Sequence, residues 1–398
     1  MSKLRLLDAE PIIEKLWLCA LYDAESNIID REEGQVFAAG GRGKGWNGRM
    51  FTRDIGFSSI LGLSRLFPNE MAASLEIDRK IRLALGLRAD RQNYVPGSPL
   101  ILEDIDQQTF KDRYGTNPYT RRTDDVLWLW WADDLFQTLP VTGEDWDWVY
   151  QTGQRCFREL YAPFYDSESG LYFGQASFVD VGGNGYPAEF GRETIEAIGC
   201  SLRVRAASTN CLYYRGLEIM AKAAELCGRA DESADWMRRA GELRESIRRH
   251  LVRPDGRVAY FLHEDGRVES REHALGTAFA ILLGVLDQDE AARAIRNYPL
   301  LPVGVPLYEP FFPGDESYHN NSSWPFVSAF FLRAREHALG TDESSTELEF
   351  LIRSCRDDTF YEWCNTLKGQ FAGQPAQLWT VAPFIGRCLN HYETRIDA

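Results

Sequence analysis

The stretch TDDVLWLWWADDLFQ at residues 123–137 is apolar on nearly all sides when it is placed on a helix. A helix without a polar face is buried among other elements rather than lying on the surface. The stretches at 54–66, 272–285 and 321–338 have the same character. Together they predict an inner set of buried helices.

Helices of a second kind separate the buried ones. The stretches at 231–250 and 288–297 each carry one apolar stripe against a charged face, as helices on an outer surface do. Strand-like alternation is confined to short pieces near 170–178 and 256–263. The helical period predicts twelve helices, at residues 9–22, 54–66, 70–85, 123–137, 145–161, 208–228, 231–250, 272–285, 288–297, 321–338, 344–354 and 375–391.

Buried and amphipathic helices broadly alternate along the chain, and this order decides the predicted architecture. Six helical hairpins, each with an inner and an outer helix, close into an all-α (α/α)6 barrel, or toroid. No linker or low-complexity run divides the chain, so we predict a single (α/α)6 catalytic domain over residues 1–398. The long connections at about 86–122, 161–207 and 298–320 are expected to gather over one end of it and to form the ligand site.

The charge balance excludes several classes of partner. The chain carries 44 Lys and Arg against 59 Asp and Glu, a net charge of −15. Because this excess repels phosphate backbones and anionic lipids, we predict no nucleic acid partner and no membrane partner. Charged residues from Asp8 to Lys15 interrupt the N-terminal apolar stretch, unlike a signal peptide. We expect a cytoplasmic protein with a small-molecule ligand, and none of these features defines an oligomeric state.

The eight cysteines and six histidines show no metal-ligand spacing. No Cys-x-x-Cys pair and no His-Glu-x-x-His motif occurs, and most cysteines lie in apolar helical stretches. We therefore predict reduced, buried thiols, no metal and no cofactor.

Two carboxylates are the candidate catalytic groups. Asp180 follows Phe178 and Val179 and precedes a pair of glycines, so it could be held partly out of water and donate a proton as a general acid. Glu362 lies between Tyr361 and Trp363 and could activate water as a general base. The competing interpretations are that Asp180 braces a glycine turn and that Glu362 is an exposed loop residue. The substitutes for the acid are Glu189 and Glu193.

Arg53 and Asp54 begin the first buried helix with a charged pair where apolar residues would be expected. Asp54 could accept hydrogen bonds from two hydroxyl groups of a sugar, with Arg53 orienting it. The alternative is that Thr52 or Asp54 is only the N-cap of the helix.

Carbohydrate recognition uses rings that stack on the apolar face of a sugar and amides or acids that bind its hydroxyl groups. The candidate loops are rich in both kinds of residue. The alternative for each tryptophan is a place in the helical core. The predicted substrate-binding residues, besides Arg53 and Asp54, are Trp46, Tyr172, Gln175, Tyr186, His319, Asn320, Trp324, Trp363, Gln374 and Trp379.

Several segments resemble, in sequence order, the motifs of six-hairpin glycosidases: MFTRDIGFSSILGL, TDDVLWLWWADD, GLYFGQASFVDVGGNGYP, EHALGTAFAILLGV, YHNNSSWPF and FYEWCNTLKGQFAGQPAQLWTVAPF. The chain is most similar to the inverting clan that contains processing α-glucosidase I and mannosylglycerate hydrolase, of the glycoside hydrolase family 63 type. This resemblance implies that Asp180 is the general acid, Glu362 the base and Asp54 a ligand of the sugar hydroxyls. It also implies that His319, Asn320 and Trp324 line the same subsite.

The sequence departs from the clan in two respects. Cys364 and Asn365 stand where relatives often have Tyr-Asn or Tyr-Asp, and no N-terminal β-sandwich pattern is seen. We therefore expect a minimal form that acts on small soluble glycosides.

The function predicted is an inverting, exo-acting glycoside hydrolase, an α-glycosidase that needs no cofactor. One alternative is a sugar isomerase or epimerase of the N-acylglucosamine 2-epimerase type, which would rely on His273 and His319. A polysaccharide lyase is a further alternative. The last is a catalytically silent carbohydrate-binding toroid.

Overall fold

The computed structural model describes residues 4–45, 48, 50–89, 124–179, 185–190, 204–315 and 317–396. Twelve α-helices lie within these residues, and each overlaps a helix predicted from the sequence. They are α1 (Pro11–Ser26), α2 (Thr52–Leu61), α3 (Pro68–Ala89), α5 (Trp128–Leu135), α6 (Gly143–Cys156), α8 (Ala207–Leu226), α9 (Ala230–Leu251), α10 (Ala274–Leu282), α11 (Gln288–Ile295), α12 (Pro325–Leu339), α13 (Ser344–Ser354) and α14 (Leu378–His391).

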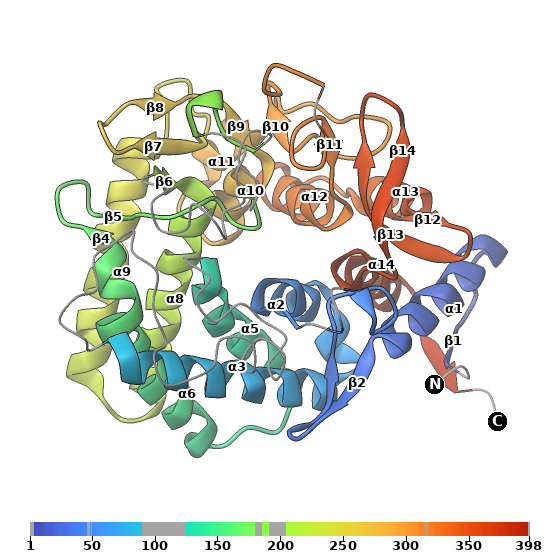
Figure 1. Cartoon of the computed structure of the whole chain (residues 1–398), viewed down its shortest axis with the longest axis horizontal. Coiled ribbons are helices and arrows are strands. Elements are labelled where there is room, and N and C mark those ends of the chain that lie inside the picture. Colours follow the sequence, from blue (N-terminus) through green and yellow to red (C-terminus); the bar gives the residue numbers. More distant parts are fainter. Residues whose placement is uncertain are drawn as a thin grey trace.

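Six of these helices contact one another in a closed order. Helix α2 packs on α5, α5 on α8, α8 on α10, α10 on α12, α12 on α14, and α14 returns to α2. Figure 1 shows α2, α12 and α14 near the middle of the molecule, with α3, α6 and α9 along its lower and left margins and α1 at the right. The six mutually contacting helices therefore form the interior, and the others cover it.

Burial along the helices agrees with this arrangement. Every residue of α10 from Ala274 to Ile281 is buried, whereas α9 buries a stripe that includes Trp236 and Leu243 and exposes its charged residues. Helices α14 and α2 approach each other closely at Gly386 in α14, where an added Cβ would overlap the carbonyl oxygen of Leu61 at the end of α2. A residue without a side chain is needed there to bring the first and last inner helices together.

The strands are short, and most of those labelled in Figure 1 lie in its upper half, with β1 and β2 at the lower right. A sheet of β11 (Ser322–Ser323), β13 (Thr359–Asn365), β12 (Cys355–Arg356) and β14 (Gln370–Pro375) precedes and flanks α14. The other sheets are small. They are β2 (Ile28–Arg31) with β3 (Gly34–Phe37), β4 (Tyr165–Asp166) with β5 (Leu171–Tyr172), β6 (Val204–Ala206) with β7 (Phe261–His263) and β8 (Val268–Glu269), β9 (Glu272–His273) with β10 (Tyr308–Glu309), and β1 (Leu4–Leu6) with β15 (Thr394–Ile396).

Two predicted helix boundaries are wrong, because strands of the sheet around β13 precede both helices. The helices expected at 321–338 and 375–391 begin at Pro325 and Leu378. Before Pro325, β11 pairs with β13 from a distant part of the chain, and before Leu378, β14 pairs with β13 as a hairpin. Strand pairing thus overrides the local helical pattern at both positions.

A buried cluster of charges joins α12, α13 and α14. The Arg387 guanidinium donates to Glu347 at 2.7 Å, to Glu336 at 2.7 Å and to the hydroxyl of Ser344 at 3.1 Å. Arg387 is 7% exposed and Glu347 is 1% exposed, so this ion pair is largely shielded from water.

Seven cysteines fall in the described residues and all are free thiols, with Cys19, Cys227 and Cys355 partly exposed and the others buried. Among the helices of the described residues, none combines the length and apolar character that crossing a membrane requires.

Candidate active site

The N-terminal ends of several inner helices meet around one side chain, Phe178. Its ring lies 5.0 to 6.1 Å, between centroids, from the rings of five residues at or beside the starts of α10, α12 and α14. The backbone N–H of Ser177 donates to the hydroxyl of Ser208 in the first turn of α8. The segment that leads to Asp180 is therefore anchored where four inner helices begin. The five residues are His273, His319, Trp324, Phe326 and Trp379.

Asp180 itself lies outside the described residues, but hydrogen bonds hold both sides of its segment. The hydroxyl of Tyr186 accepts from the Ala176 N–H at 3.0 Å and donates to the Val179 carbonyl at 3.1 Å. On the other side, the hydroxyls of Tyr260 and Tyr308 both donate to the carbonyl of Gly185, at 2.7 and 3.3 Å. Tyr186, predicted to bind sugar, acts here as a brace for the segment.

Of the substitute acids, only Glu189 is described. It is exposed and pairs with Arg267 at 3.1 Å. The carboxylate is already paired at the surface, so the structure gives no reason to prefer Glu189 over Asp180. Glu193 lies outside the described residues.

Glu362 lies on β13 rather than in an exposed loop, and only 3% of it is accessible. The hydroxyl of Tyr318 donates to its Oε1 at 3.3 Å, and the backbone N–H of Gln374 on β14 donates to its Oε2 at 2.9 Å. The β13–β14 register shifts between Tyr361 and Trp363, at Glu362 itself. The carboxylate is thus buried at an irregularity of the sheet and held by two donors.

Asp54 is in the first turn of α2 and is 2% exposed. The Gln377 amide, which precedes α14, donates to its Oδ1 at 3.2 Å, and the Arg53 guanidinium lies 3.6 Å from its Oδ2. The capping alternative does not describe this helix, because its N-cap is Phe51 and the Thr52 hydroxyl donates to Asp78. Asp54 therefore joins the starts of the first and last inner helices.

The stretch from Gln374 to Gln377 connects Glu362 with Asp54. Gln374 binds the first carboxylate through its backbone, and Gln377 binds the second through its side chain. Glycines of the loop after β3 pack on both amides: a Cβ at Gly40 would overlap the Gln377 Oε1, and a Cβ at Gly41 would lie 3.1 Å from the Gln374 Oε1. The two carboxylates thus belong to one connected group.

The predicted aromatic residues pack mainly on one another. The rings of Trp379 and Phe326 stack at 4.3 Å, and the Arg53 guanidinium lies 5.6 Å from the centroid of Trp379. The Trp324 indole donates to the Tyr318 carbonyl at 2.9 Å. Trp324 and Trp379 are at most 2% exposed, so Trp363, which is partly exposed, is the better placed of the three to offer a ring to a sugar.

The remaining predicted binding residues have different surroundings. His319 is fully buried beside Tyr318 and Phe178. The Asn320 amide binds the N–H and the carbonyl of Phe312, both at 2.9 Å, so it braces its own loop. Tyr172 stacks on Tyr213 of α8 at 3.9 Å. Gln175 is buried, with its carbonyl bound by the Thr209 hydroxyl at 2.7 Å, and Trp46 lies outside the described residues.

The predicted binding residues leave out several members of this group. Gln377, Tyr318 and Gly373 contact Asp54 or Glu362 directly. Gln377 belongs to one of the candidate loops and stands immediately before a buried helix, as do His273 and Trp324. Tyr318 and Gly373 carry no comparable signal.

Gly373 makes room for Glu362 on the neighbouring strand, and Gly373→Ala is expected to lower kcat by roughly 100-fold, as a misplacement of about 1 Å can do. An added Cβ would overlap the Glu362 Oε2 and would lie 2.7 Å from its Cβ. Steady-state kinetics checks this prediction. Gly369→Ala is the matched control, because Gly369 also has a positive φ, at 64°, but has no atom within 4 Å of an added Cβ. Equal losses in both variants would show that backbone strain, not displacement of Glu362, causes the effect.

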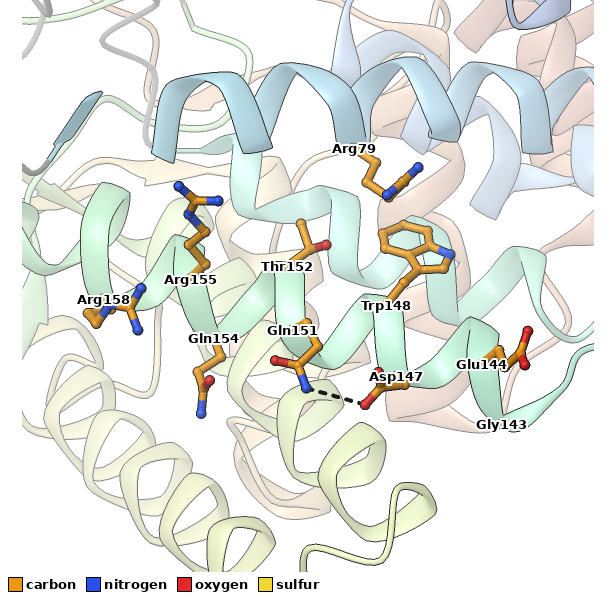
Figure 2. A pocket seen from close by; sticks show the side chains of 10 residues that line it. All are labelled: Arg79, Gly143, Glu144, Asp147, Trp148, Gln151, Thr152, Gln154, Arg155 and Arg158. Carbon is orange, nitrogen blue, oxygen red and sulfur yellow. Dashed lines mark hydrogen bonds between the residues drawn. The ribbon is translucent and has the colours of Figure 1, made fainter. Parts of the chain in front are cut away.

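A groove of about 710 Å³ lies on the outer layer, away from this group (Figure 2). It is lined mainly by α6, with Arg79 of α3 facing Trp148 across it. The Trp148 ring is stacked on Trp128 at 5.8 Å, and the Arg79 guanidinium lies 5.5 Å from its centroid. These neighbours already cover the ring, so the groove is a poor platform for a sugar.

Comparisons with known proteins show what this chain is similar to. The family model described as "Mannosylglycerate hydrolase MGH1-like glycoside hydrolase domain" matches residues 179–380, half of the chain. A solved wild-type glycosidase is 17% identical, with 94% of this chain and 96% of that chain covered and a TM-score of 0.63. The GH63 mannosylglycerate hydrolase from Thermus thermophilus, solved with Tris and D-glycerate, is 13% identical, with coverages of 93% and 99% and a TM-score of 0.63. No curated protein matches the chain.

Proposed function

Because the chain belongs to the mannosylglycerate hydrolase MGH1-like glycoside hydrolase family, we propose that it is an inverting, exo-acting glycosidase that cleaves α-linked small glycosides. The protein is a glycoside hydrolase of the six-hairpin superfamily, as the sequence predicted, and this argues against the epimerase, lyase and silent-binding alternatives. We further propose that the closed order of inner helices is an (α/α)6 toroid and that residues 1–398 form one catalytic domain.

The observation that carries the mechanism is the environment of Glu362. Its carboxylate is buried, held by Tyr318 and Gln374, and connected through Gln377 to Asp54. A fixed carboxylate in a shielded site can orient one water molecule and accept its proton during attack on the anomeric carbon. Asp54, with its own donor Gln377, is suited to accept hydrogen bonds from sugar hydroxyl groups.

In the proposed reaction Asp180 protonates the glycosidic oxygen while Glu362 removes a proton from the attacking water on the opposite face of the sugar. An inverting pair needs carboxyl groups about 6.5–9.5 Å apart, which leaves room for that water. Both proton transfers come from side chains, so the proposal requires no cofactor. Sugars attached to a small acid are the first substrates to test, since the family model and one structural relative are named for mannosylglycerate.

The test is a screen of α- and β-linked glycosides, including mannosylglycerate, with proton NMR detection of the first sugar released. The proposal expects hydrolysis of an α-glycoside with the β-anomer appearing first. An α-anomer released first from the same substrate would show retention and would overturn the inverting mechanism.

Asp180→Asn is expected to lose most activity on substrates with poor leaving groups, because these need a proton on the departing oxygen. On a glycosyl fluoride, whose leaving group needs less help, the loss should be much smaller. Parallel kinetics on the fluoride and on a natural glycoside checks this. Equal losses on both substrates would remove Asp180 from the role of acid.

A further inference from the structure

His273 is a buried side chain that the proposed reaction does not use. It is the N-cap residue of α10 and is 1% exposed. Its ring lies beside those of Tyr260, at 5.2 Å, and Tyr308, at 5.5 Å, with Phe178 at 6.1 Å. Phe178 also touches His319 and Trp379, so His273 belongs to the same ring of helix starts as the candidate site.

Neither ring nitrogen of His273 has a hydrogen-bond partner in the part of the chain that the structure describes. Buried polar atoms without partners cost free energy and are few in folded proteins. Two hydroxyl groups lie close by, on Tyr260 and Tyr308, but both donate to the carbonyl of Gly185 instead. The surroundings therefore fix the ring, and among the described residues they leave both nitrogens without a hydrogen-bond partner.

Burial lowers the pKa of His273 to about 3, and the neighbouring His319 lowers it further in the same direction. The imidazole is therefore neutral at physiological pH. A neutral imidazole has one N–H donor and one nitrogen acceptor, a combination that suits hydroxyl groups rather than anions. It is also too weak a base to abstract a proton near pH 7.

We propose that His273 is a substrate-binding residue that donates one hydrogen bond to the hydroxyl groups of the bound sugar and accepts one from them. This inference rests on the proposed function, in which the sugar lies against Asp54 and Glu362. It places hydroxyl recognition on the α10 side of the site. In the closed contact order of the six inner helices, α10 is three positions from α2, which carries Asp54. A site that has buried polar groups for a hydroxyl discriminates strongly against sugars that lack it.

The experiment pairs His273→Phe with sugars that lack single hydroxyl groups. The substrates are 4-nitrophenyl α-D-glucoside or α-D-mannoside, whichever the wild-type protein hydrolyses faster, and its 2-, 3-, 4- and 6-deoxy derivatives. For the wild-type protein, at least one deoxy derivative should lose about 10- to 100-fold in kcat/KM. For His273→Phe, the parent substrate should lose a similar factor, and removal of that same hydroxyl should then cost less than about threefold.

Two further variants keep the test decisive. His273→Asn and His273→Gln retain a donor and an acceptor, so at least one of them should keep part of the wild-type kcat/KM. These variants test the inference even if His273→Phe does not fold. His263→Phe is the matched control, because His263 is buried among rings on β7 but has Glu189 3.7 Å from its Nδ1. If every deoxy derivative loses the same factor with and without His273, the inference is wrong.

Failure of this inference differs from failure of the proposed function. If only the inference fails, each deoxy derivative loses the same factor in the wild-type protein and in His273→Phe, while Glu362→Gln is still inactive. Failure of the proposed function appears as a Glu362→Gln variant that still hydrolyses glycosides, whatever the deoxy series shows.

Discussion

Glu362→Gln is expected to lower kcat by about 10²–10⁴-fold, the contribution that a general base commonly makes. The amide has the shape of the carboxylate but cannot accept the proton of the attacking water. The amide oxygen can still accept from the backbone N–H of Gln374, so the packing between β13 and β14 should persist. Steady-state kinetics on the substrate found by the glycoside screen, with circular dichroism as a check of the fold, provides the measurement.

Glu349→Gln is the control for this loss. Glu349 is an exposed residue of α13 whose partner is Arg353, and it is not one of the residues of the candidate site. Its activity should equal that of the wild-type protein. A Glu362→Gln variant with kcat within threefold of the wild-type value would contradict the role of Glu362 as base.

Arg387→Met is expected to lower the free energy of unfolding by about 3 kcal/mol, at the lower end of what the loss of one partner of a buried ion pair costs. Glu347 would keep Arg333, at 3.2 Å, but would lose the closer of its two cationic partners while remaining out of water. Urea denaturation followed by tryptophan fluorescence measures this change.

Arg353→Met is the matched control, since Arg353 is more exposed and pairs with the exposed Glu349. Such surface pairs contribute about 0–1 kcal/mol. Adding Glu347→Gln to Arg387→Met should restore part of the stability, because it removes the charge left without its partner. Equal stabilities for the Arg387 and Arg353 variants would show that burial of this pair has no energetic consequence.

The helices were predictable because their apolar period extends over two or more turns. The stretch at 272–285 is apolar almost without interruption, and α10 is buried at nearly every position. Local sequence determines such an element, since no distant segment is needed to explain its pattern. The family could be predicted for a related reason, because its motifs lie at the starts of these helices.

The surroundings of Glu362 could not be predicted in the same way. Strand β13 does not bury its residues in simple alternation, and its partner β11 comes from a distant segment of the chain. The sequence indicated a carboxylate at this position but not that it is buried or which groups donate to it. Its hydrogen bond from Tyr318 depends on the conformation of another loop, with φ of 99° at Tyr318 itself.

The roles of the aromatic residues were also difficult to predict from the sequence. Trp324 and Trp379 were expected to face a sugar, yet other rings surround both of them. Composition alone does not distinguish an aromatic residue that lines a site from one that packs behind it. Trp363, by contrast, is partly exposed on β13, next to Glu362.

The bond between Gln377 and Asp54 spans 323 positions of the chain, and Asn27 reaches the Ala376 carbonyl across 349. During synthesis the segment around Asp54 leaves the ribosome long before its partners are made. Every preceding helix pair can fold as it emerges, but the ring stays open until α14 packs on α2. Hydrolytic activity is therefore expected to arise in a single late step of biogenesis, and a nascent chain that stops before residue 377 should be inactive however much of it has folded.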